Sequence, residues 1–263
     1  MIANEESEIV CKQADGLAKI LWSKVAPLLA WDDYPCSRPA PVGCGVLVRV
    51  GDTVLVLSAA HVFAEFRNRV MWTNLGGELL CLPELRCRFT GSPDLGNHHG
   101  DSVDAAVASL PKDYSHDLLS QGLELSNLET ETDQDESHYL LLGYPANRTR
   151  IEAREVRVKR KALICSEVQN AVYAQVGCDR RTHILFEWRK ASPSVTGSLS
   201  GSSGCGIWRF DRRTPTNSPK LVATFTGLQR MIGGRKVLVG TRINTHLELL
   251  DVCQERVSFT PAA

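Results

Sequence analysis

The sequence predicts an all-β protein with one helix before its strands and one helix after them. Between about residues 40 and 245, short runs with alternating apolar residues follow one another and are separated by turn residues. Many short strands of this kind indicate a β-barrel or sandwich. The expected strands cover residues 45–50, 53–57, 140–144, 155–158, 183–188 and 221–226.

The first 30 residues show the apolar spacing of a helix instead of a strand. The stripe consists of Ile9, Leu17, Ile20, Leu21, Val25 and Leu28. We expect an amphipathic helix from about residue 5 to about residue 26, ended or kinked by Pro27. It would pack on the outside of the barrel, or it would be a docking helix for a regulatory protein.

A second helix is expected at the end of the chain. Asn244 is a capping residue, and the apolar residues that follow it have helical spacing up to Cys253. The acidic segment 124–136 is poor in large apolar residues and predicts a connection between two halves of the β-region.

Composition excludes several classes of protein. The 263 residues include 30 basic and 30 acidic side chains, so the net charge gives no reason to expect nucleic acid or an anionic membrane as partner. No secretory signal begins the sequence, and no apolar stretch reaches the roughly 20 residues of a membrane span. Nine cysteines, an odd number, then favour reduced thiols and a cytoplasmic location. The spacing around Cys81, Cys87 and His98 matches no metal site, so no metal or cofactor is expected.

The turn from Gly201 to Gly206 is the strongest functional signal. A Gly-x-Ser-Gly turn presents one serine hydroxyl beside converging backbone N–H groups, as acyl transfer requires. By itself the segment 192–206, rich in serine and glycine, also fits a flexible loop.

A histidine and an aspartate upstream favour the catalytic interpretation. His61 follows an apolar strand and two small residues, so its ring would lie at a strand end with little bulk around it. Asp104 precedes a small, apolar strand, where a buried carboxylate must find a donor.

These three segments resemble the motifs of trypsin-like serine proteases of the chymotrypsin fold. The resemblance rests on Ser58-Ala59-Ala60-His61, Asp104-Ala105-Ala106-Val107 and Gly201-Ser202-Ser203-Gly204, which occur in the family's order. Two weaker blocks, Leu141-Leu142-Gly143-Tyr144-Pro145 and Val239-Gly240-Thr241-Arg242-Ile243, agree with it. The match covers roughly residues 40–255 and is closer to intracellular bacterial and HtrA-like or viral-type branches than to secreted digestive enzymes.

The resemblance implies two six-stranded Greek-key β-barrels with the site between them. It divides the chain into an N-terminal helical extension (1–35), a first barrel with the histidine and aspartate (36–130), a second barrel with the serine (131–245), and a C-terminal helix and tail (246–263). It implies a serine endopeptidase that acts on a peptide or protein substrate.

The roles of the site residues follow from the same resemblance. Ser203 would be the nucleophile, His61 its general base and Asp104 the group that orients the histidine, while the N–H groups of Gly201 and Ser203 would form the oxyanion hole. The pocket for the substrate side chain would be bordered by Gly197, Ser198, Phe225, Thr226, Gly227 and Leu238. No acidic residue is among them, which disfavours an Arg or Lys substrate and favours a small or apolar one.

Two neighbours of Ser203 refine this interpretation. The Gly-x-nucleophile-Gly frame selects Ser203 over Cys205, which is expected to be a small buried residue. Relatives activated by propeptide cleavage have an aspartate before the nucleophile, and this chain has Ser202. We therefore expect control by a partner, or constitutive activity, and no zymogen of that type.

An alternative function is an inactive binding module with a protease fold. The stretch 148–161 contains seven basic residues and two acidic ones, so it would bind phosphate or an acidic protein. A solvated strand face is the favoured explanation of this stretch, because no aromatic residue interleaves for base stacking, and a nucleic-acid partner is not expected.

Overall fold

The structure is a computed structural model, and it describes most of the chain. The described residues are 2–31, 39–66, 69–75, 78–82, 85–91, 103–110, 118–129, 138–146, 149–152, 155–158, 160–187, 199–210, 219–230 and 236–257.

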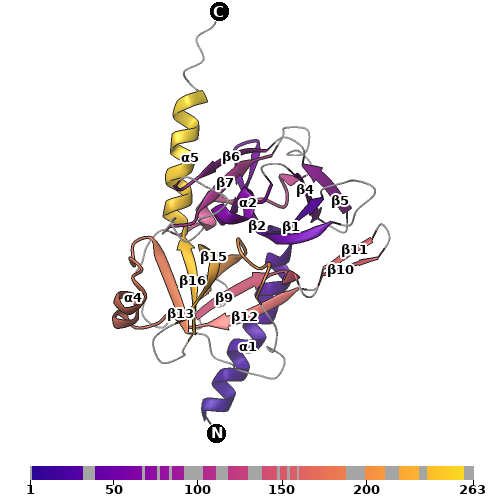
Figure 1. Ribbon diagram of the computed structural model, residues 1–263. Helices are drawn as coiled ribbons and strands as arrows, with labels where there is room; N and C mark the ends of the chain where they lie inside the picture. The colour runs from indigo at the N-terminus through magenta and orange to yellow at the C-terminus, as the bar shows by residue number, and fades with distance from the viewer. Residues whose placement is uncertain are drawn as a thin grey trace, which may run out of the picture.

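Two curled β-sheets form the body of the molecule (Figure 1). The first sheet has the strand order β5-β4-β1-β2-β3-β7-β6, with β8 also paired to β2. Its strands are β1 (Val25–Trp31), β2 (Ala40–Val50), β3 (Thr53–Ser58), β4 (Val70–Leu75), β5 (Glu78–Leu82), β6 (Arg86–Phe89), β7 (Ala106–Ser109) and β8 (Leu123–Glu124). All these neighbours are antiparallel except β2 and β8.

The second sheet is antiparallel and has the order β12-β9-β14-β15-β16-β13. Its strands are β9 (His138–Gly143), β12 (Lys161–Cys165), β13 (His183–Glu187), β14 (Gly206–Phe210), β15 (Lys220–Arg230) and β16 (Lys236–Arg242). The strands β10 (Thr149–Glu152) and β11 (Glu155–Val158) form a separate hairpin. The chymotrypsin-like, all-β fold class predicted from the sequence is confirmed.

The short helical elements connect these strands. They are η1 (Trp22–Lys24), α2 (Ala60–Ala64), η2 (Leu125–Asn127) and α4 (Asn170–Val176).

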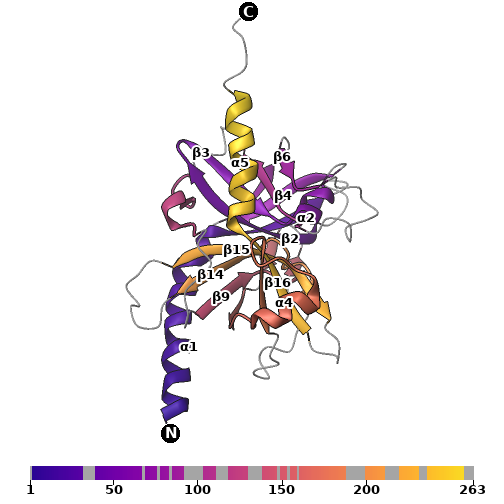
Figure 2. The same cartoon turned by 90° about the vertical axis from the view of Figure 1, so that its left-hand side faces the viewer.

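Each of the two long helices contacts the sheet that is not next to it in the sequence. Helix α1 (Ile2–Leu21) precedes the first sheet in the chain but packs on β9 and β12 of the second. Helix α5 (Ile243–Val257) follows the second sheet but contacts β7 of the first. Figure 2 shows them extending from opposite ends of the molecule. Among the described residues, no helix is both long and apolar enough to cross a membrane.

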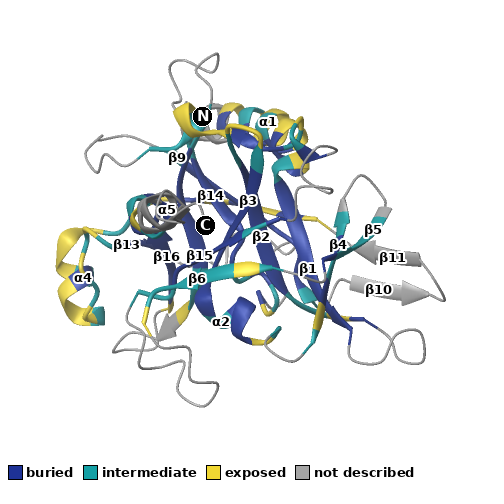
Figure 3. Cartoon of the chain, turned by 90° about the horizontal axis from the view of Figure 1, so that it is seen from above, coloured by how far each residue is buried: buried dark blue, intermediate teal, exposed yellow. Residues whose placement is uncertain are grey.

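The N-terminal helix differs from its prediction in length and in orientation. It ends at Leu21, and residues 25–31 form a fully buried strand. Its buried side chains include Val10, Ala14, Ala18 and Leu21, whereas Ile9 and Ile20 of the predicted stripe are exposed. Figure 3 shows the exposed outer face of α1. The error arose because Val25 and Leu28 belong to a buried strand, whose continuous apolar run can be mistaken for a helix.

Pro27 lies inside strand β1 and does not end the helix. Its carbonyl accepts the hydroxyl of Thr73 in β4 at 2.8 Å, and β4 pairs with β1 only from Leu28 onward. In a strand, the N–H and C=O of one residue point to the same side, so an N–H at position 27 would also point toward β4. It would lie before the first residue pair that β1 and β4 form. No sheet hydrogen bond is lost there.

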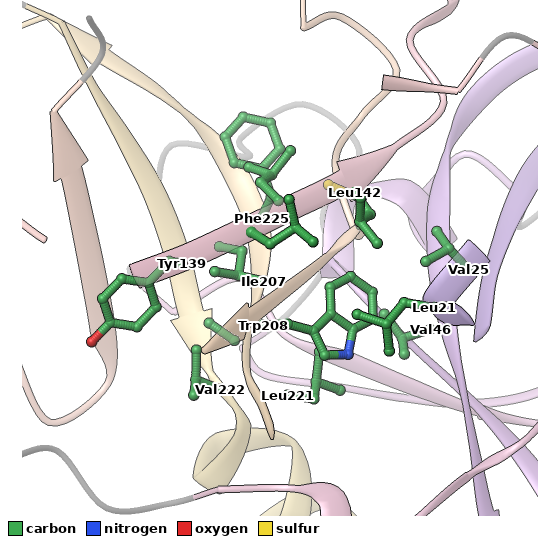
Figure 4. Close-up of a cluster of buried hydrophobic side chains, with 14 of the residues drawn as sticks. Leu21, Val25, Val46, Tyr139, Leu142, Ile207, Trp208, Leu221, Val222 and Phe225 are labelled. Atoms are coloured by element: carbon green, nitrogen blue, oxygen red, sulfur yellow. The ribbon is translucent and has the colours of Figure 1, made fainter. Parts of the chain in front are cut away.

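A continuous hydrophobic core joins the sheets. Leu21, Val25 and Val46 meet residues of the second sheet such as Trp208 and Leu142 (Figure 4). A second cluster, around Leu28, Val56, Phe63 and Met71, fills the inside of the first sheet. The site therefore rests on packed strands from both sheets.

Candidate active site

His61 and Asp104 form a doubly bonded pair at the end of strand β3. Ser58 is the last residue of this strand, and His61 lies in the first turn of α2. The Nδ1 of His61 lies 2.7 Å from Oδ2 of Asp104, and the backbone N–H of His61 donates to Oδ1 at 3.0 Å. The carboxylate thus fixes both the ring and the main chain of the histidine, and a bond at Nδ1 leaves Nε2 as the nitrogen for proton transfer.

Asp104 has an uncommon backbone conformation that its neighbours hold. Its φ of 52° lies in the left-handed region, which aspartate and asparagine tolerate better than most residues. On one side, the carbonyl of Val103 accepts the hydroxyl of Thr241 from the second sheet. On the other, the N–H of Ala105 donates to the hydroxyl of Thr90 at 2.8 Å. The aspartate is thereby anchored to both sheets.

The serine turn is shaped by two glycines with positive φ. Gly201 has a φ of 77° and Gly204 a φ of 83°, values that other residues adopt only with strain. Within the turn, Ser202 N–H donates to Leu199 and Cys205 N–H to Ser202, while Gly204 N–H donates to Phe225 at 2.6 Å. Among the described residues, no backbone carbonyl accepts the N–H of Gly201 or of Ser203. These are the two N–H groups that the sequence assigns to the oxyanion hole.

The serine turn packs directly against the strands that lead to the histidine. The carbonyl of Ser203 accepts the N–H of Cys44 in β2 at 2.7 Å. A Cβ atom on Gly43 would lie 2.6 Å from both γ-methyl groups of Val62, the residue after His61, and 2.9 Å from the carbonyl of Ser203. Gly43 is therefore in close contact with both the segment that follows His61 and the turn that carries Ser203.

Gly204 allows the closest approach between the two segments. A Cβ atom there would lie 2.0 Å from the carbonyl oxygen of Cys44 and 2.1 Å from the hydroxyl of Ser58. Ser58, three residues before His61, donates to that same carbonyl at 2.7 Å. The structure thus brings His61, Asp104 and the Ser203 turn together.

Four of the six predicted pocket residues lie on the paired strands β15 and β16. Gly197 and Ser198 lie outside the described residues. Phe225 and Leu238 are buried in the core, and Figure 4 shows the Phe225 side chain among Leu142 and Ile207. Thr226 and Gly227 are partly exposed, and the Thr226 hydroxyl donates to Val239 at 3.1 Å.

Two buried residues next to the site have no motif that reveals them in the sequence. His246 of α5 faces three partners: the carbonyls of Ser58 and Arg242, at 3.1 and 3.3 Å, and the Thr224 hydroxyl at 3.3 Å. Burial lowers the pKa of His246, against the opposing effects of the two carbonyls and of Asp104. The other residue is Cys44, whose thiol lies beside Gly201.

The cysteines of the site region are buried thiols. Cys205 is fully buried, as predicted, and its pKa is raised well above the ordinary value, chiefly by burial. The cysteines that are free thiols, with no disulfide among them, are Cys11, Cys44, Cys81, Cys87, Cys165, Cys178 and Cys205. In the same part of the chain, no group of three or more His, Cys, Asp or Glu side chains is arranged to hold a metal ion.

The arrangement of two curled sheets, with histidine and aspartate on the first and serine before β14 of the second, defines the trypsin-like fold. A solved structure of that fold, neuropsin, a serine protease expressed in the limbic system of mouse brain, is similar to this chain with a TM-score of 0.56 and 15% sequence identity. The match covers 88% of this chain and 94% of neuropsin. No protein-family model and no curated protein matches the sequence. At this identity the likeness establishes the fold, and the bacterial or HtrA-like branch gains no support from it.

Proposed function

We propose that this protein is a serine endopeptidase that cleaves peptide bonds through an acyl-enzyme. The observation that carries the proposal is the double hydrogen bond of Asp104 to the ring and the main chain of His61, formed at the strand end against which the Ser203 turn packs. The trypsin-like fold supports the general class of the activity.

In the acylation step, His61 Nε2 takes the proton of the Ser203 hydroxyl while Oγ attacks the substrate carbonyl carbon. Asp104 holds the tautomer that has its proton on Nδ1 and stabilises the imidazolium that forms. The imidazolium then gives its proton to the departing amine, and the C–N bond breaks. General-base assistance of this kind contributes about 10²- to 10⁴-fold to the rate.

In the deacylation step, water replaces the amine and His61 takes a proton from it. Attack on the ester carbon forms a second tetrahedral oxyanion. As this collapses, the bond to Ser203 Oγ breaks, the His61 imidazolium returns its proton to Oγ, and the acid is released. The N–H groups of Gly201 and Ser203 would bind the oxyanion in both steps, because no backbone carbonyl of the described residues uses them.

We further propose that a partner protein controls the site through the N-terminal helix. Trp22, directly after α1, packs against Tyr144 with ring centroids 5.4 Å apart and ring planes tilted by 53°. The backbone N–H of Tyr144 donates to the Cys44 thiol, which lies beside Gly201. A protein that docks on α1 would therefore influence the serine turn through the contacts from Trp22 to Tyr144 and from Cys44 to Gly201. A cytoplasmic location, a bacterial origin and a preference for small or apolar substrate side chains remain predictions.

The test is labelling with a fluorophosphonate, followed by profiling with a peptide library. Wild-type protein should be labelled, and Ser203→Ala should lose the label. The matched control is Ser202→Ala, whose buried hydroxyl has no hydrogen-bond partner among the described residues. Labelling that survives in Ser203→Ala but disappears in Cys205→Ser would overturn the assignment of the nucleophile.

The second candidate is a binding module that uses the basic stretch 148–161. Its β10–β11 hairpin forms a sheet of its own, and the register places Arg150 opposite Arg157. An unlabelled wild-type protein that binds an acidic ligand in a salt-sensitive manner would favour this candidate.

A further inference from the structure

Cys44 joins the two halves of the site through its backbone. Its N–H donates to the carbonyl of Ser203, and its own carbonyl accepts the hydroxyl of Ser58. Residues on either side of Cys44 are glycines, but at position 44 the chain places a side chain against the serine turn. That side chain is fully buried.

The thiol of Cys44 lies near one donor and two acceptors, of which the carbonyl of Gly201 is the nearer. Its sulfur accepts the N–H of Tyr144 at 3.3 Å, and its S–H faces the carbonyl of Gly201 at 3.5 Å, closer than the Tyr144 carbonyl at 4.0 Å. Burial raises the pKa of Cys44 to about 12. The thiol therefore keeps its proton near neutral pH and remains a hydrogen-bond donor.

Gly201 joins two peptide planes whose relative orientation a glycine restricts least, so hydrogen bonds to these planes determine the conformation of the turn. The plane before it is fixed where the carbonyl of Ser200 accepts the N–H of Ala146 at 2.8 Å. Since a trans peptide directs its N–H away from its carbonyl, this bond points the Gly201 N–H away from Ala146. The plane after it carries the N–H of Ser202, which donates to the carbonyl of Leu199 at 2.9 Å, and the carbonyl of Gly201, which the Cys44 thiol contacts at 3.5 Å.

The same short segment supports both anchors. Tyr144 holds the Cys44 sulfur, and Ala146 holds Ser200, while a Cβ atom on Gly201 would lie 2.6 Å from that of Ala146. Gly201 thus packs closely against Ala146, and the peptide on each side of it accepts a hydrogen bond, from Ala146 and from Cys44.

We propose that Cys44 is a positioning residue that, together with the Ser202–Leu199 hydrogen bond, fixes the peptide between Gly201 and Ser202, which connects the two N–H groups of the oxyanion hole. This inference rests on the proposed hydrolytic function. The thiol itself touches no reacting atom, and it acts through the carbonyl of Gly201.

The kinetic test compares Cys44→Ala, Cys44→Ser and a control. Loss of a whole oxyanion donor costs about 10²- to 10³-fold in kcat, so loss of a contact to the peptide that connects the two donors in Cys44→Ala should cost about tenfold, with KM changed less than twofold. A peptide boronic acid, whose tetrahedral adduct places an oxygen in the hole, should bind more weakly by a similar factor. Cys44→Ser keeps a donor and an acceptor and should recover most of the activity.

The control is Cys165→Ala, which also removes a buried thiol. The sulfur of Cys165 contacts Leu163 at 3.8 Å, and burial raises its pKa to about 12 as well. Its kcat should equal that of wild type. Equal kcat in folded Cys44→Ala and Cys165→Ala would overturn the proposal, as would a loss in Cys44→Ala that Cys44→Ser does not recover.

A second measurement does not depend on activity. In ¹⁵N-labelled protein, the Ser202 amide signal reports on the peptide between Gly201 and Ser202. It should be single in wild type and in Cys165→Ala, and doubled or broadened in Cys44→Ala by increased motion of that peptide. An unchanged Ser202 signal in Cys44→Ala would overturn the positioning role. If wild type takes no fluorophosphonate label, the proposed function fails, while this measurement still decides the role of Cys44.

Discussion

The two halves of the site are held by different forces. On the histidine side, a carboxylate makes two direct bonds to His61, so a charged side chain determines the geometry. On the serine side, the turn is determined by backbone hydrogen bonds and by the absence of side chains at Gly201 and Gly204. Substitutions on the histidine side should therefore lower activity, whereas substitutions of the glycines on the serine side should lower the stability of the fold.

The largest expected effect is the loss of activity in Asp104→Asn. The asparagine amide has one acceptor oxygen where the carboxylate has two, so it cannot accept from both the backbone N–H and the Nδ1–H of His61. The wrong histidine tautomer is then favoured, and kcat should fall about 10⁴-fold. Asparagine tolerates the positive φ at this position, so the fold should survive. Peptide kinetics beside a thermal unfolding curve will measure both effects.

Asp179→Asn is the matched control for this prediction. The Asp179 carboxylate also makes side-chain and backbone hydrogen bonds, but to exposed Arg181. Its replacement should leave kcat unchanged. Equal kcat in Asp104→Asn and wild type would remove Asp104 from the mechanism.

The next effect in size is a loss of stability in Gly204→Ala. The new Cβ would lie 2.0 Å from the Cys44 carbonyl oxygen, and the left-handed backbone adds strain. Together these should lower the free energy of unfolding by about 3 kcal/mol or more. Urea denaturation followed by tryptophan fluorescence will measure the change.

Gly177→Ala separates the two contributions. Gly177 ends α4 with a φ of 74°, but a Cβ atom there would meet nothing within 4 Å. It should cost only about 1 kcal/mol, from backbone strain alone. If both variants lose the same stability, close packing at Gly204 contributes nothing.

The same contrast explains what the sequence could predict. His61 and Asp104 lie in short blocks beside regular strands, and Ser203 lies between glycines, so local patterns are sufficient to find them. The strand from Val25 to Trp31 was missed because complete burial removes the alternation that marks a strand. Cys44 and His246 were missed because their contacts join residues far apart in the sequence, and no local pattern records such contacts.

The smallest expected effect concerns the pH dependence of stability through His246. Because burial lowers its pKa in the folded protein, the unfolded chain binds a proton at a higher pH than the folded one. The free energy of unfolding should therefore fall as pH drops through the unfolded value of 6.5. His246→Gln cannot take up this proton, so its stability should fall less between pH 7.5 and pH 5.5 than that of wild type. Urea denaturation at both pH values compares the two slopes. Identical slopes would mean that His246 protonates as readily in the folded protein as in the unfolded chain. The contact between His246 of α5 and Ser58 of β3 would then tolerate a positive charge beside Asp104.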